Sequence, residues 1–143
     1  MDESQFLNVM ESFVKYQTRI EEALGYKIRL EVRGSDHYFI VSEDGLTSYG
    51  GFSMSMLEGC CGVVVSHRAW VTTSQRGKGV GALLNQIRCD IAKDQGYGKI
   101  MCTTIMDNER QIKILNKNGW ELSDTFVNPK TGNTIGTYYK ELL

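Results

Sequence analysis

The sequence predicts an α+β fold in which one helix comes first and further helices flank a mixed, mostly antiparallel sheet of about seven strands. Three observations support this prediction. Apolar residues recur at helical spacing near the N-terminus, short alternating segments separated by turn residues follow, and a glycine-rich loop joins a strand-like segment to a helix-like one. The 143 residues fit a single domain, residues 1–143, without a repeat, a low-complexity tract or a linker.

The N-terminal segment predicts a long helix followed by a hairpin. From Asp2 to Leu24 the apolar residues fall at helical spacing, and Gly25 is suited to end that helix. Alternating residues predict strands at 26–33 and 37–42, joined by a tight turn at Gly34-Ser35-Asp36. This helix contains several glutamates, so we do not expect the segment to be a signal peptide or a transit peptide.

Two further strands follow. The hairpin signal Asp44-Gly45 precedes a third strand at about residues 46–56, and Gly50-Gly51 within it predicts a bulge or a close approach of two backbones. Residues 61–72 are rich in valine and aromatic residues and predict the fourth strand.

The second half alternates helices and strands. After the glycine loop we expect a helix at 80–95, a strand at 99–106, a helix that Asp107 or Asn108 caps and Gly119 ends, and closing strands at 120–127 and 134–140.

Composition excludes several classes of protein. The net charge is −1, with basic and acidic residues mixed along the chain, which argues against nucleic acid as the main partner. No apolar run approaches the roughly 18 residues that a membrane span needs. The two histidines do not lie at ligand spacing from a cysteine pair, so no metal site is expected. The four cysteines are expected to be free, buried thiols, as in a cytoplasmic protein.

The glycine loop, Gln75 to Gly81, predicts an anion site. Glycines allow a ligand to approach the backbone closely, and the N-terminus of the following helix offers free N–H groups. A nucleotide triphosphatase loop is disfavoured because Gly77-Lys78 is followed by Gly79, and not by serine or threonine. The dinucleotide fingerprint is formally met, but the preceding strands stand in hairpin order, which does not fit an open parallel sheet.

Two blocks of sequence resemble the GNAT superfamily of acetyl-CoA-dependent N-acyltransferases. The first is Arg76-Gly77-Lys78-Gly79-Val80-Gly81, which matches the signature Gln/Arg-x-x-Gly-x-Gly/Ala. The second runs from Asn108 to Gly119-Trp120 and is separated from the first by one helix and one strand. The resemblance covers about residues 45–140 and implies a GNAT-like domain that uses acetyl-CoA as co-substrate.

The resemblance also implies where the co-substrate binds. Backbone amides of the loop would hold the pyrophosphate of coenzyme A, and the fourth and fifth strands would splay apart to receive its pantetheine arm. The expected binding residues are Trp70, Val71, Thr73, Arg76, Gly77, Lys78, Gly79, Val80, Gly81 and Asn108.

The catalytic groups depart from the family's pattern. The tyrosine that often protonates the leaving thiolate is replaced by Leu115, and Tyr138 and Tyr139 are alternatives. His67, on the fourth strand, is the candidate general base, because an imidazole titrates near neutral pH; Glu58 is a weaker candidate. Each of these side chains could instead have a purely structural role.

The acceptor side also departs from the family. Only the short turn after Gly34 joins the first two strands, where the family places helices that form a wall of the acceptor groove. That wall is missing, or supplied by the N-terminal helix, or supplied by a partner chain in a homodimer. The resemblance implies transfer of acetyl from acetyl-CoA to an amine of a small molecule or a protein by direct attack. The alternative is a GNAT-fold module that binds coenzyme A or a protein without transfer.

Overall fold

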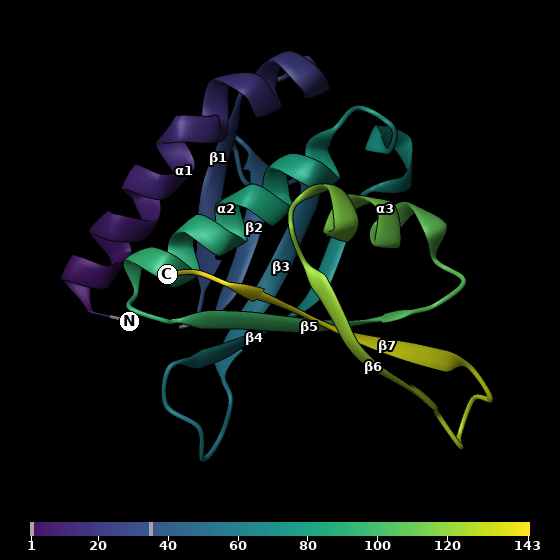
Figure 1. Cartoon of the computed structure of the whole chain (residues 1–143). Helices are drawn as coiled ribbons and strands as arrows, with labels where there is room; N and C mark the ends of the chain where they lie inside the picture. Colours follow the sequence, from purple (N-terminus) through teal and green to yellow (C-terminus); the bar gives the residue numbers. More distant parts are fainter. Residues whose placement is uncertain (1, 35) are drawn as a thin grey trace.

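The computed structural model describes residues 2–34 and 36–143. In these residues a seven-stranded sheet carries its helices on one side, with the N-terminal helix first (Figure 1), so the expected α+β architecture is confirmed. The helices are α1 (Glu3–Leu24), α2 (Val80–Asp94) and α3 (Glu109–Lys117). The strands are β1 (Ile28–Arg33), β2 (His37–Ser42), β3 (Ser48–Met56), β4 (Val63–Val71), β5 (Lys99–Ile105), β6 (Glu121–Val127) and β7 (Thr134–Glu141).

Helix α1 begins and ends where the sequence predicts. The Asp2 side chain accepts a hydrogen bond from Gln5 N, whose own side chain caps the Asp2 amide, and Gly25 ends the helix at φ +82°. The apolar face of α1 is buried in the common core, where Phe13 is 1% exposed. A polar contact also joins α1 to α2, because the Tyr16 hydroxyl donates a hydrogen bond to the Asp90 carboxylate at 2.5 Å.

The sheet order is β1-β2-β3-β4-β5-β7-β6, and β4 with β5 is its parallel pair. Helix α2 makes the crossover between these two strands, as a parallel connection requires. The pair is short, since it joins only residues 63–65 to residues 99–101. Beyond Val65 the two strands separate, which is the splay that the family resemblance implies.

The two adjacent glycines of β3 lie at a bulge and at a close approach of two backbones, the two alternatives that the sequence predicts. Register shifts occur beside them, in the pairing with β2 and in the pairing with β4. A Cβ atom at Gly50 would lie 2.8 Å from Trp70 O, and one at Gly51 would lie 2.6 Å from Tyr38 O. Glycine is needed here because the neighbouring backbones are too close for any side chain. The predicted turn at residues 34–36 includes Ser35, which lies outside the described residues.

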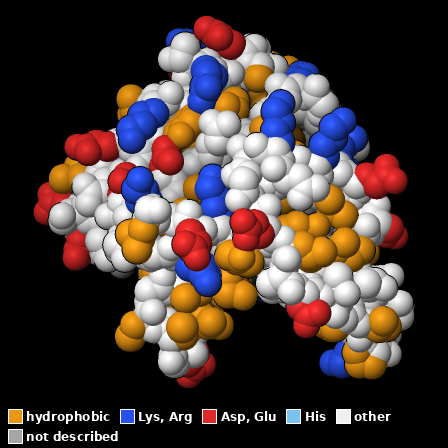
Figure 2. Space-filling model, in the orientation of Figure 1, with side chains coloured by type: hydrophobic (Ala, Val, Ile, Leu, Met, Phe, Trp, Pro, Cys, Tyr) orange, Lys and Arg blue, Asp and Glu red, His pale blue; other side chains and the backbone are white. Residues whose placement is uncertain are grey.

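The other side of the sheet is open between two projections, the β3–β4 turn (residues 57–62) and the β6–β7 hairpin (Figure 1). Figure 2 shows the hollow between them. Cys60 and Cys61 lie in the β3–β4 turn and are exposed, whereas Cys89 and Cys102 are buried. The expectation of four buried thiols is therefore wrong for the first pair, because a projecting turn has no core around it. None of the helices in the described ranges is long and apolar enough to cross a membrane.

Candidate functional site

A cleft of about 740 Å³ lies between the end of β4, the glycine loop, the first turns of α2, and α3. It collects side chains and backbone from both sequence blocks. Of the expected binding residues, those that line it are Trp70, Val71, Arg76, Gly77, Gly79, Gly81 and Asn108.

The glycine loop presents unpaired backbone amides to this cleft. Gly77 and Gly79 have φ of +81° and +83°, and a Cβ atom at either position would meet no atom within 4 Å. After Arg76, the first backbone amide for which the described residues provide an acceptor is that of Leu83, which donates to Gly79 O at 3.2 Å. The intervening N–H groups and the positive end of the α2 dipole therefore lie together at the cleft, an arrangement suited to an anion.

Beyond the loop, the α2 N-terminus packs closely against α3. A Cβ atom at Gly81 would lie 3.3 Å from Ile114 Cδ1, so a larger residue here would require the Ile114 side chain to shift. Asn108 caps α3, because its side chain accepts a hydrogen bond from Gln111 N at 3.2 Å. Asn108 thus fixes the start of the helix that forms the second wall of the cleft.

Three expected binding residues do not line the cleft with their side chains. Lys78 Nζ donates to Gln75 Oε1 at 2.8 Å, Val80 is 1% exposed within the core, and Thr73 lies in the short 3₁₀ turn before the loop. Arg76 lines the cleft but its guanidinium is engaged by the chain itself, because Nε donates to Val71 O at 3.1 Å. The loop therefore offers its backbone more than its cationic side chains, as the sequence pattern indicates.

Strand β4 has a bulge between His67 and Trp70, just before the part of the strand that lines the cleft. Its pairing with β3 shifts between Gly51 and Ser53, and Arg68 within the shift has φ +54°. His67, just before the bulge, lies outside the cleft, with Nε2 3.4 Å from Ser55 Oγ. Since adjacent side chains of a strand point to opposite faces, His67 faces the open side and Ser66 faces α2.

The tyrosines and Leu115 occupy structural positions. Leu115 is fully buried in the core, and Tyr138 is 2% exposed in the same cluster. Tyr139 donates a hydrogen bond to Glu121, and this bond, with the charge of that carboxylate, raises the pKa of the phenol. Glu58 lies exposed in the β3–β4 turn.

The N-terminal helix does not supply a wall on the open side. It packs beside α2, and two hydrogen bonds join the helices. Ser12 Oγ donates to Asp94 Oδ2 at 2.5 Å, and the Tyr16 hydroxyl donates to Asp90. Helix α1 therefore lies on the helical side of the sheet.

Two buried polar residues of α2 were not identified from the sequence. Asn85 and Arg88 are each 2% exposed and line the cleft beside Leu84. The signal was present, because positions 84, 85, 88 and 91 share one face of a helix, and two of these four residues are polar. Among the titratable side chains described in residues 2–34 and 36–143, no group of three could hold a metal ion.

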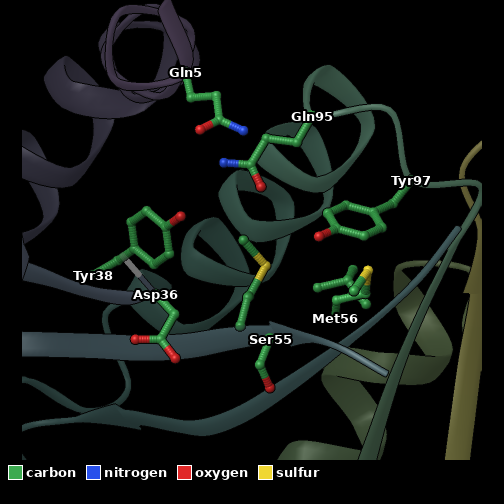
Figure 3. A pocket seen from close by; sticks show the side chains of 9 residues that line it. Gln5, Asp36, Tyr38, Ser55, Met56, Gln95 and Tyr97 are labelled. Atoms are coloured by element: carbon green, nitrogen blue, oxygen red, sulfur yellow. The ribbon is translucent and has the colours of Figure 1, made fainter. Parts of the chain in front are cut away.

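A second, smaller cavity of about 270 Å³ lies at the other end of α2 (Figure 3). Gln5 of α1 and Gln95 point toward each other across its rim, and Tyr38 and Tyr97 flank it. None of the expected site residues lines this cavity, so it is separate from the cleft at the glycine loop.

Comparison with known proteins identifies the family. The family model "Acetyltransferase (GNAT) family" matches residues 6–120. Three similar structures are a nourseothricin acetyltransferase, Ard1 from Thermoplasma volcanium and an N-acetyltransferase from Staphylococcus aureus. Their TM-scores are 0.64, 0.67 and 0.65 at 18%, 16% and 20% identity; the alignments cover 75%, 76% and 75% of this chain. The chain spans 65%, 71% and 67% of these proteins. No curated protein matches it by sequence.

Proposed function

The chain belongs to the acetyltransferase (GNAT) family, and on this basis we propose that it transfers an acetyl group from acetyl-CoA to an amine. The proposal places the pyrophosphate of acetyl-CoA on the free amides between Gly77 and Leu83, and the pantetheine arm in the cleft where β4 and β5 separate. The observation that carries it is the loop of unpaired amides that opens into that cleft.

The acceptor amine would approach from the open side of the sheet. In direct attack, the amine nitrogen bonds to the thioester carbonyl carbon, the carbon–sulfur bond breaks, and coenzyme A leaves as a thiolate. His67 faces this side and is the proposed base that takes the proton of the amine. The bulge at Arg68 separates His67 from the part of β4 that lines the cleft. The base would therefore act from the open side of β4 on a thioester bound at its cleft side.

A single-domain, cytoplasmic protein is the setting that we propose for this activity. The hollow between the β3–β4 turn and the β6–β7 hairpin would hold the acceptor, a small molecule or a protein side chain. A second copy of the chain could close this hollow as a homodimer, because α1 does not cover it.

One observation favours a second candidate function. Leu115, at the position where the family often has a tyrosine, is fully buried and cannot donate a proton. A protein that binds coenzyme A without transferring acetyl would keep the cleft and not need this acid. A thiol-release assay with polyamines, aminoglycosides, free amines and peptides distinguishes the two, since only a transferase releases coenzyme A in an acceptor-dependent manner.

Calorimetry with acetyl-CoA and with coenzyme A tests the shared part of both candidates. We expect saturable binding at micromolar concentrations, and competition between the two ligands because they share the pyrophosphate and the pantetheine arm. Absence of heat at high micromolar ligand would reject the assignment of the cleft.

A further inference from the structure

Arg88 is a buried cation for which the described residues provide no counter-ion. It lies on α2, is 2% exposed, and makes its recorded hydrogen bond from Nη1 to Ser66 Oγ at 3.1 Å. Its Nε has no acceptor among the described residues, and the ion pairs of that part of the chain do not include it. A guanidinium keeps its charge inside a protein, so an unpaired one in the core is costly unless an anion is bound near it.

The groups around Arg88 do not neutralise it. The ring of Trp120 lies 5.3 Å from the guanidinium carbon, and the neighbouring titratable groups are the thiols Cys89 and Cys102. Burial raises the pKa of Cys102 to about 11, so this thiol is neutral at physiological pH. Burial raises the pKa of Cys89 as well.

A second unpaired donor lies one helical turn away. Asn85 accepts a hydrogen bond from Trp120 Nε1 at 3.1 Å, while its Nδ2 has no acceptor within the described ranges. Residues three apart share a face of a helix, so both unpaired donors belong to the side of α2 that lines the cleft. Buried donors of this kind are nearly always satisfied, which indicates an acceptor from outside the chain.

The position of Arg88 identifies which part of the donor is near it. Arg88 is eight residues beyond Val80, about 12 Å along the helix from the glycine loop. Its partner Ser66 is the first residue of β4 beyond the last pair with β5, Val65 with Met101. Arg88 therefore lies at the inner end of the cleft, away from the pyrophosphate site and toward the sulfur end of the donor.

We propose that Arg88, with Asn85 beside it, forms an anion subsite that stabilises the thiolate released when the carbon–sulfur bond of the donor breaks. The electron pair of that bond stays on sulfur, and the guanidinium provides the compensating charge without giving up a proton. Solvent then protonates the thiolate on release. The subsite would stabilise the leaving thiolate by its positive charge, whereas a tyrosine at position 115 would do so by donating a proton. This inference rests on the proposed binding of the donor in the cleft.

The test compares the affinities of coenzyme A and S-methyl-coenzyme A by calorimetry between pH 6 and pH 10. Only coenzyme A can ionise, so the ratio of the two affinities isolates its thiol from the titration of the protein. An ordinary thiol has a pKa of about 8.5, and a nearby cation lowers such a value by ~1–3 units. We expect the ratio to rise with pH by at least about tenfold in total, and to level off only above about pH 8.5, where free coenzyme A is itself ionised.

Two variants and one control assign that rise. Arg88→Met removes the charge and Asn85→Asp supplies the missing counter-ion, so both should flatten the ratio; circular dichroism and thermal unfolding check their folds. Arg110→Met removes an exposed cation from the rim of the same cleft. It should change both affinities together and preserve the pH dependence of their ratio.

The outcomes separate this inference from the proposed function. Binding of neither ligand rejects the cleft itself, and the inference with it. Binding of both with a flat ratio in the wild type rejects the subsite alone, whether or not the variants fold. Preferential binding of succinyl-CoA over acetyl-CoA, lost in Arg88→Met, together with a flat ratio, would assign Arg88 to an acyl carboxylate and overturn the proposal.

Discussion

The indole Nε1 of Trp120 donates a 3.1 Å hydrogen bond to Asn85 Oδ1 inside the core. Trp120 ends the second sequence block, and Asn85 lies in the helix that follows the first. The bond therefore joins α2, one wall of the cleft, to the residue that follows the C-terminal turn of α3, the other wall. Because both groups are buried, the distance between these walls is fixed by a specific contact as well as by apolar packing.

Gly79→Glu should lower the affinity for coenzyme A by at least about tenfold, a loss of 1.4 kcal/mol. The new side chain would enter the open space at the loop and bring a negative charge to the anion site. Gly96→Glu is the matched control, because Gly96 also has positive φ, +89°, and open space around its Cβ, but lies at the other end of α2. Calorimetry on both variants measures the effect; equal losses would mean that helix strain, and not the loop, explains it.

His67→Ala should lower the acetyl transfer rate by roughly 10²–10⁴-fold, because a positioned general base typically contributes that much. The control is His37→Ala, since His37 is the second histidine of the chain and bonds Ser53 Oγ at 2.9 Å on the same open side. The rate of His37→Ala should stay near the wild-type value. Steady-state kinetics with an active amine check this, and an unchanged rate in His67→Ala would assign the base elsewhere.

Leu115→Ala should destabilise the fold by about 2–5 kcal/mol, as expected for a large-to-small change in a packed core. Leu115 is fully buried, whereas Leu122 is 46% exposed, so Leu122→Ala is the control and should cost much less. Urea unfolding measures both. A small effect at Leu115 would show that this position is not a packing residue and would reopen its role in the site.

Tyr16→Phe should lower the free energy of unfolding at neutral pH. Above pH 10 the free energy of unfolding should fall less steeply in this variant than in the wild type. Burial, and then the hydrogen bond to Asp90, raise the pKa of Tyr16 from 10.0 to about 12. A folded-state pKa above the unfolded one means that the stabilisation is complete below pH 10 and is lost as the pH rises toward 12.

The measurement is the free energy of unfolding in urea at pH 7 and between pH 10 and pH 12, with Tyr26→Phe as control. Tyr26 is 53% exposed, and its hydroxyl makes no hydrogen bond in the described part of the chain. Identical pH dependence in wild type and Tyr16→Phe would show that the bond between α1 and α2 does not contribute.

Much of the fold could be predicted because its signals are local. The capping box at Asp2, the turn at Gly25 and the cap at Asn108 each depend on residues within a few positions of one another. The predicted element bounds agree with the structure to within about three residues. The role of Gly50 and Gly51 could also be predicted, since two adjacent glycines in a strand indicate a close approach of neighbouring backbones.

The site was predicted only in part, for a physical reason. The glycine loop follows from a contiguous pattern, and the structure shows that this loop borders the cleft; its binding of an anion stays a prediction. The environment of a side chain depends on residues far away in the chain. Cys60 and Cys61 look like core residues by type but lie on a projecting turn.

The sequence by itself determined the order of helices and strands, the anion loop and the resemblance to the acetyltransferase family. Only the tertiary structure decided that α1 packs beside α2, which leaves the opposite side of the sheet open, and that Arg88 is buried next to Ser66 with no counter-ion in residues 2–34 and 36–143. Local sequence sets backbone preference, whereas the burial and pairing of a charge are set by contacts between segments 22 residues or more apart.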